Sequence, residues 1–160
     1  MLPRTKENTL NHQNKTPQPT LTMTQGLPAS GKSTWAVAQV KASTAGSVVR
    51  ISKDLLRSML HADTRGPGTE RQVLDARDAL ISVYLRNGVS VIIDDTNFLP
   101  YHEQELRKLA QRSGAAFVIH DFIDVPLDEC LRRNRLRDSP VPDSAIIEMH
   151  DKYLSSQVAS

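Results

Sequence analysis

The sequence has little of what small proteins use in place of a large hydrophobic core. It holds one cysteine, Cys130, so no disulfide can form within the chain, and its five histidines show no zinc-ligand spacing. A chain of 160 residues that is 39% hydrophobic is long enough to bury one core without such staples. We therefore expect one folded domain rather than a disulfide-rich or zinc-bound scaffold.

Long apolar runs and a strong net charge are missing as well. No run approaches the ~18 residues that span a bilayer, and no apolar signal segment opens the chain, which predicts a cytoplasmic protein without a membrane partner. The formal net charge is only +2, and three cations against one anion in residues 1–19 account for all of it. A protein that wraps duplex nucleic acid needs a Lys or Arg for each neutralised phosphate. This charge therefore argues against such a protein but permits an enzyme that holds one strand end.

The chain divides into a polar start and a folded remainder. Residues 1–19 are rich in Asn, Gln, Thr and Pro, which predicts a disordered tail, and residues 20–160 form the expected domain. Short β-prone runs alternate there with helical stretches, the pattern of an α/β fold with a central parallel sheet of about four to five strands flanked by helices. The expected strands are 20–25, 47–51, 89–93 and 115–122, and the expected helices are 32–43, a stretch from 54, 70–87, 100–113, 127–137 and 142–155.

One motif lies between the first strand and the first helix. Residues 26–33, Gly-Leu-Pro-Ala-Ser-Gly-Lys-Ser, match the phosphate-binding pattern G-x-x-x-x-G-K-[ST]. Its glycines let backbone N–H groups close around an anion at the positive end of a helix. Lys32 would bind the β- and γ-phosphates and Ser33 would bind Mg²⁺. The motif predicts a nucleotide ligand, and ATP is the expected one because the sequence has no guanine-binding signature. The residues expected to bind ATP are Gly26, Pro28, Ala29, Ser30, Gly31, Lys32, Ser33 and Thr34.

Acidic residues follow the next two expected strands. A kinase acting on a hydroxyl needs a carboxylate beside the acceptor, and Asp54 stands just past residues 47–51, at the edge where α/β sheets bind ligands. Arg57 would share its helical face and could hold an acceptor phosphate. Asp94 and Asp95 follow 89–93 and could serve Mg²⁺ in the manner of a Walker B aspartate, or Asp95 could instead pair with Arg57 and position it. Asp95 and Thr96 are thus acceptor-side candidates. Helix and loop capping is the alternative for all of these acidic positions.

Four arginines crowd residues 132–137. Arginines there could cover the nucleotide phosphates and stabilise the charge of the transferred phosphoryl group. We expect at least one of Arg132, Arg133, Arg135 and Arg137 to do so, with Arg133 and Arg137 as the candidates for ATP binding, while solvated charges at a helix end are the alternative for each. Trp35, just inside the first helix, is expected to pack rather than to stack on a base.

Together these segments resemble the kinase domain of the phage polynucleotide 5′-hydroxyl kinases. The resemblance covers roughly residues 20–155 and rests on five stretches in the same order and spacing. It implies an adenylate-kinase-like P-loop fold and transfer of the ATP γ-phosphate, with Mg²⁺, to single-stranded or nicked 5′-OH ends of DNA or RNA. The five stretches are 26–36, Ser-Lys-Asp-Leu-Leu-Arg at 52–57, Ile-Ile-Asp-Asp-Thr-Asn at 92–97, Asp-Val-Pro at 124–126 and Arg-Arg-Asn-Arg-Leu-Arg at 132–137.

The resemblance also implies roles for single residues. Asp54 would be the general base, Arg57 would bind the acceptor's phosphate with support from Asp95, and Arg137 would be the lid arginine. Two residues depart from the family pattern: Leu55 replaces a second acidic residue, and Lys53 replaces an arginine. Acceptor contacts are therefore expected to differ.

Other readings stay open at this point. The family's 3′-phosphatase motif has no match here, so a separate phosphatase or ligase could act as a partner. The sequence also permits a homo-oligomer. A P-loop kinase with another hydroxyl acceptor (a metabolite, a nucleotide sugar or an aminoacyl-tRNA) shares Lys32 and Asp54. A nucleotide-binding switch without kinase chemistry would not need Asp54. If a phage encodes the chain, its place is the host cytoplasm.

Overall fold

A four-stranded parallel sheet organises the computed structural model, which describes residues 16–157. The strand order is β2-β3-β1-β4, with all neighbours parallel. The strands are β1 (Thr20–Gln25), β2 (Val48–Ile51), β3 (Ser90–Ile93) and β4 (Ala116–Asp121). This confirms the expected α/β class and the central parallel sheet.

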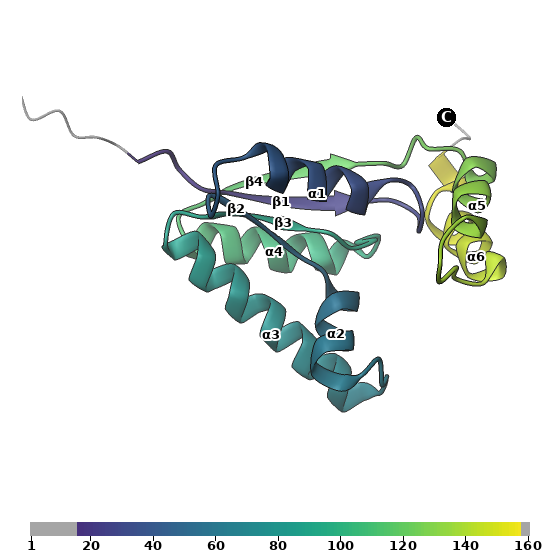
Figure 1. The fold of residues 1–160 in the computed structure, drawn as a ribbon, viewed down its shortest axis with the longest axis horizontal. Coiled ribbons are helices and arrows are strands. Elements are labelled where there is room, and N and C mark those ends of the chain that lie inside the picture. The colour runs from purple at the N-terminus through teal and green to yellow at the C-terminus, as the bar shows by residue number, and fades with distance from the viewer. Residues whose placement is uncertain (1–15, 158–160) are drawn as a thin grey trace, which may run out of the picture.

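Helices cover both faces of the sheet (Figure 1). One face carries α1 (Lys32–Ala42), and the other carries α3 (Pro67–Arg86) and α4 (Pro100–Arg112). The short α2 (Lys53–His61) packs on α3. Beyond the carboxyl ends of the strands lie α5 (Leu127–Arg135), α6 (Asp143–Tyr153) and the 3₁₀ turn η1 (Ser155–Gln157). Every strand therefore delivers its following loop to one edge of the molecule.

The buried apolar residues form two clusters. The larger packs β1, β2 and β3 against α2, α3 and α4, with Leu21, Val91 and Ile93 fully buried at its centre. The smaller belongs to the α5–α6 region and joins Cys130 and Ile146 to Leu27 of the phosphate-binding loop. The α5–α6 group thus has a core of its own that reaches the loop.

The expected boundaries are close to those observed, with two informative differences. The third helix starts at Pro67 rather than at residue 70, because proline suits the first helical position, where no N–H is needed. The ordered chain also begins before Thr20: Gln18 Nε2 donates to the Gly114 carbonyl at 3.0 Å, and the Ala116 N–H donates to the Pro19 carbonyl at 2.9 Å. Residues 1–15 of the expected tail lie outside the described residues.

Across residues 16–157, the structure contains no helix with the length and apolar character needed to cross a membrane.

Candidate active site

The phosphate-binding loop joins β1 to α1, as its motif predicts. Its lysine is buried, and Lys32 Nζ donates to the carbonyls of Gly26 (2.9 Å) and Leu27 (2.6 Å), so the ammonium points into the loop. Gly31 has a φ of 106°, a left-handed conformation that glycine adopts without strain. The loop thus presents one cation and the N-terminus of an 11-residue helix to the same place. These residues fit a phosphate group.

Gly26 occupies the tightest point of the loop. A Cβ on this residue would lie 2.8 Å from Ser30 Oγ and 2.9 Å from Phe122 Cβ. Its N–H donates to the Thr96 carbonyl at 3.2 Å, which ties the loop to the segment after β3. The motif therefore needs glycine here for close approach to two neighbouring segments.

Burial favours the neutral form of Lys32 over the charged form. Desolvation lowers its pKa from the usual 10.5 to about 8, although the negative charge of Asp94 opposes the change. The positive charge of Arg137 lowers the pKa further. An anion in the loop would restore the charged form of Lys32.

The two aspartates after β3 point to different partners. Asp94 forms an ion pair with Arg50, with 2.6 Å between Arg50 Nη2 and Asp94 Oδ2. Asp95 Oδ1 accepts from the Lys53 N–H at 3.0 Å, while Oδ2 is buried without a hydrogen-bond partner. Burial raises the pKa of Asp95 to about 6, with the charge of Lys53 opposing the change. Asp95 therefore caps the N-terminus of α2, the helix that carries Asp54.

The expected pairing of Asp95 with Arg57 is not what the structure shows. Arg57 binds Glu70 of α3 instead, with 2.6 Å from Nε to Oε1 and 2.8 Å from Nη2 to Oε2. Its Nη1 donates to Asp54 Oδ1 at 2.5 Å. The hydrogen bonds with Glu70 raise the pKa of Arg57 and lower that of Glu70. Glu70 thus takes the supporting role that the sequence reasoning gave to Asp95.

The Asp54 side chain is exposed to solvent although it accepts a hydrogen bond from Arg57. Its side chain is 80% exposed, whereas that of Arg57 is 5% exposed. A second arginine, Arg65, lies in the loop between α2 and α3 and brings Nη2 to 3.7 Å from Asp54 Oδ1. Sequence reasoning missed both Arg65 and Glu70, because no local pattern links either of them to Asp54.

The arginines of residues 132–137 divide by their contacts. Arg133 Nη1 donates to the Ser30 carbonyl at 3.2 Å and its Nε to Glu129, so this side chain reaches the phosphate-binding loop. Arg132 also pairs with Glu129, and Arg135 pairs with Asp143. Arg137 is exposed and has no ion pair within residues 16–157. Among these four arginines, the structure thus records a contact with the phosphate-binding loop for Arg133.

The aromatic residue of α1 packs, as expected. Trp35 stacks on His120 of β4 with ring centroids 3.9 Å apart and meets Phe122 edge-on. Phe122 in turn lies against Gly26 and Gly31. This aromatic group supports the back of the phosphate-binding loop.

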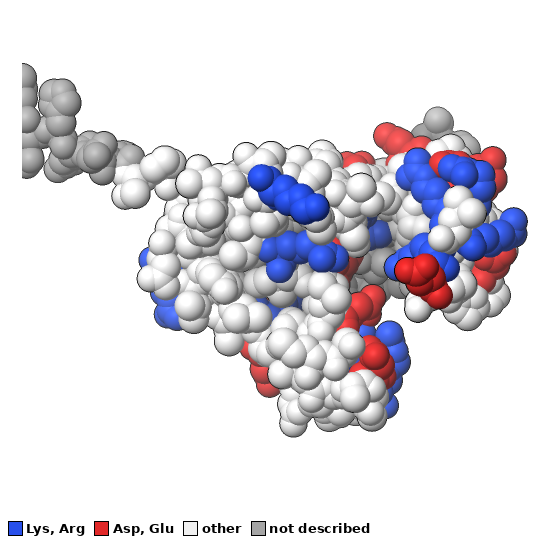
Figure 2. All heavy atoms as spheres, in the orientation of Figure 1, with Lys and Arg blue, Asp and Glu red and all other residues white. Residues whose placement is uncertain are grey.

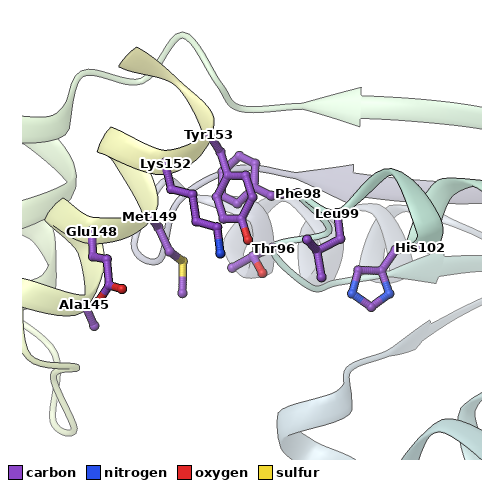
Figure 3. Close-up of a pocket in the computed structure, with 9 residues that line it drawn as sticks. All are labelled: Thr96, Phe98, Leu99, His102, Ala145, Glu148, Met149, Lys152 and Tyr153. Carbon is purple, nitrogen blue, oxygen red and sulfur yellow. The ribbon is translucent and has the colours of Figure 1, made fainter. Parts of the chain in front are cut away.

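A cavity of about 310 Å³ opens between α6 and the segment after β3 (Figure 3). Its walls are mixed: Phe98 and Tyr153, whose rings stack at 5.1 Å, share them with the charged side chains of Glu148 and Lys152. Thr96 lines it and carries the carbonyl that binds Gly26, so the cavity adjoins the phosphate-binding loop. His102 lies at the end away from α6. A larger cavity of about 520 Å³ runs along β2 and holds none of the predicted site residues.

Charged side chains face one another across a hollow (Figure 2). The α5–α6 region, with its four arginines, lies on one side, and the ends of α2 and α3, with Asp54, Arg57, Arg65 and Glu70, lie on the other. Within the described residues no group of three or more His, Cys, Asp or Glu side chains could hold a metal ion.

This fold and loop define a P-loop kinase. A family model described as an AAA domain matches residues 21–155, and the chain belongs to this P-loop kinase family. P-loop kinases bind ATP, and the residues predicted to do so, from Gly26 to Thr34, lie in the loop before α1 and in its first turn.

The chain is similar to proteins with different names. The chain is 29% identical over 130 residues, 80% of its length, to L-seryl-tRNA(Sec) kinase of Methanococcus maripaludis. A chain in the Pnkp1/Rnl/Hen1 RNA repair complex has a TM-score of 0.76 and 28% identity over 91% of this chain. Kti12 of Chaetomium thermophilum with ADP-AlF3, at 21% identity and a TM-score of 0.62, shares the fold over 83% of this chain and 79% of its own. The chain spans about half the length of the first two relatives, 50% and 47%.

Proposed function

We propose that the chain is a polynucleotide 5′-hydroxyl kinase that transfers the γ-phosphate of ATP, with Mg²⁺, to the 5′-OH end of RNA or DNA. The observation that carries the proposal is the Asp54 carboxylate, which is 80% exposed yet fixed by Arg57 at the start of α2. A carboxylate that is both oriented and accessible suits a general base for a hydroxyl. The similarity to a chain of an RNA repair complex supports a nucleic-acid acceptor.

Each assigned residue would have one task. ATP supplies the phosphoryl group, which forms a bond to the acceptor oxygen as its bond to the ADP oxygen breaks. Asp54 takes the hydroxyl proton, and Lys32 holds the phosphates at the loop. Ser33 would hold Mg²⁺, and Arg133 and Arg137 would stabilise the charge on the transferred group. Arg137→Ala should therefore lower kcat more than ATP affinity.

The cavity beside the loop supports an acceptor with a flat ring. Its stacked Phe98 and Tyr153 and its Met149 offer an apolar and aromatic surface on which a base could stack. Lys152 and Glu148 add one charge of each sign to the same cavity. The Thr96 carbonyl joins this wall to the phosphate-binding loop. A terminal nucleotide could thus lie in the cavity with its sugar hydroxyl toward the loop.

In a second candidate function the acceptor is also an RNA, but the hydroxyl that receives the phosphate belongs to an amino acid attached to it. The 29% identity to an L-seryl-tRNA(Sec) kinase favours the serine hydroxyl of an aminoacyl-tRNA. Both candidates need Lys32 and Asp54, so only the acceptor separates them.

The test is transfer of labelled γ-phosphate from ATP with Mg²⁺ to five acceptors: 5′-OH DNA, 5′-OH RNA, the 5′-phosphorylated twin of each, and seryl-tRNA. We expect label on the 5′-OH strands alone, and its loss in Asp54→Asn with ATP binding retained. Asp75→Asn on the exposed surface of α3 is the matched control and should stay active. Label on seryl-tRNA alone would establish the second candidate, and label on no acceptor would overturn both.

A further inference from the structure

We infer that Arg65 binds the acceptor's backbone phosphate beside the reacting hydroxyl, in the place that the family resemblance gave to Arg57. The inference rests on the proposed function and adds a phosphodiester-binding residue to the same site. It follows from three observations: how Arg57 is occupied, where Arg65 stands, and how its loop is built.

Arg57 is committed to protein carboxylates. Three of its N–H groups donate to Glu70 and Asp54, and its side chain is 5% exposed. A phosphodiester brought to this guanidinium would meet two carboxylates that already balance its charge. It would have to displace one of them, and displacing Asp54 would disorder the base itself. Arg57 therefore orients Asp54 and is closed to the acceptor.

Arg65 has the opposite properties. Its side chain is 70% exposed, and its Nη2 lies 3.7 Å from Asp54 Oδ1, too far for a hydrogen bond and close enough for electrostatic attraction. Its guanidinium therefore keeps its donors available for bidentate binding of a phosphate. Asp54 and Arg65 therefore lie side by side. This arrangement suits an acceptor whose reacting hydroxyl and nearest phosphate are attached to the same sugar.

The loop that carries Arg65 is built to turn back along α2. Ala62 and Asp63 have φ values of 46° and 64°, a left-handed pair that reverses the chain after the helix. The turn is held by the Thr64 N–H, which donates to the His61 carbonyl at 2.9 Å, and by Ser58 Oγ, which donates to Asp63 Oδ2 at 3.3 Å. The position of Arg65 next to Asp54 thus follows from an ordered turn.

The experiment compares two 5′-OH oligonucleotides: one with ordinary phosphodiesters and one whose first linkage is an uncharged methylphosphonate. We expect Arg65→Gln to lower kcat/KM at least about tenfold on the charged acceptor, mainly through KM, because a charge-assisted bidentate contact is lost. On the neutral acceptor Arg65→Gln and the unaltered protein should be equal. Arg65→Lys should recover part of the loss, since a lysine keeps the charge without the fork.

The controls separate this inference from the proposed function. Arg71→Gln on α3, an exposed arginine paired with Asp75, should match the unaltered protein on both acceptors. Equal losses of Arg65→Gln on both acceptors, or no loss on either, would overturn the role of Arg65 while leaving the kinase assignment intact. An unaltered protein that phosphorylates neither oligonucleotide would overturn the proposed function and this inference with it.

Discussion

The side-chain amide of Asn134 pairs with the backbone of Val141 in both directions: Nδ2 donates to the carbonyl at 2.7 Å, and Oδ1 accepts from the N–H at 3.1 Å. Asn134 is buried at the end of α5, and Val141 precedes α6. The pair therefore closes the loop of residues 136–142, which carries Arg137.

Asn134→Ala should leave the Val141 N–H and carbonyl without partners and destabilise the protein by about 1–3 kcal/mol. It should also lower turnover, because Arg137 loses its fixed position. Denaturant unfolding and steady-state kinetics measure the two effects. Asn134→Asp should destabilise at least as much as Asn134→Ala, because it places a buried carboxylate against the Val141 carbonyl and near Asp143. Unchanged stability in Asn134→Ala would contradict this reading.

Glu70→Gln should reduce kcat with little change in ATP affinity, because Arg57 loses its charged partner and no longer holds Asp54 in place. The cost in stability should be only about 1 kcal/mol, since the Glu70 side chain is 38% exposed. The matched control is Glu103→Gln, which removes an exposed pair with Arg107 on α4. Equal turnover in both variants would show that Arg57 orients Asp54 without Glu70.

The pKa of Lys32 predicts a pH dependence for nucleotide binding. Burial puts this pKa at about 8, so Lys32 is charged below that pH and neutral above it. ATP affinity should be level below pH 8 and then fall, approaching tenfold per pH unit. Calorimetric titration from pH 6.5 to 9.5 measures this. Lys32→Met should bind weakly at every pH, without the slope. A level profile for the unaltered protein would be evidence against an anion contact at Lys32.

Gly26→Ala should disrupt the phosphate-binding loop. The new methyl group would overlap Ser30 Oγ and Phe122 Cβ at a φ of 156°, for a cost of about 2 kcal/mol and at least a tenfold loss of ATP affinity. Gly68→Ala is the control, because nothing lies within 4 Å of its Cβ and it sits in the first turn of α3. That variant should be neutral or stabilised by up to about 1 kcal/mol.

Local sequence patterns were enough to predict most of the fold. Gly88 and Gly114 end their helices with φ values of 77° and 67°, as their places in the sequence predict. The apolar run of residues 89–93 ends in two aspartates and forms a strand with both faces buried. The phosphate-binding motif fell between strand and helix because its own glycines determine the turn.

The acceptor side was harder to predict, because it depends on contacts between elements. Glu70 lies 13 positions after Arg57, and the two meet only because a left-handed turn at Ala62 and Asp63 folds α3 back on α2. Neither residue is glycine, so the sequence gives no sign of the turn. Asp95 was expected to pair with Arg57, but its carboxylate accepts a hydrogen bond from the Lys53 N–H at the start of α2 instead. Sequence spacing alone could not choose between these partners.

The division of the buried core ties one of its two parts to the phosphate-binding loop. Within the described residues the α5–α6 cluster and the sheet cluster have no buried member in common, and the α5–α6 cluster includes Leu27 of that loop. Arg133 adds a second link from the same region to the loop, at the Ser30 carbonyl. A change in the packing of α5 and α6 should therefore reach the nucleotide site directly, through a contact that does not pass through the core of the sheet.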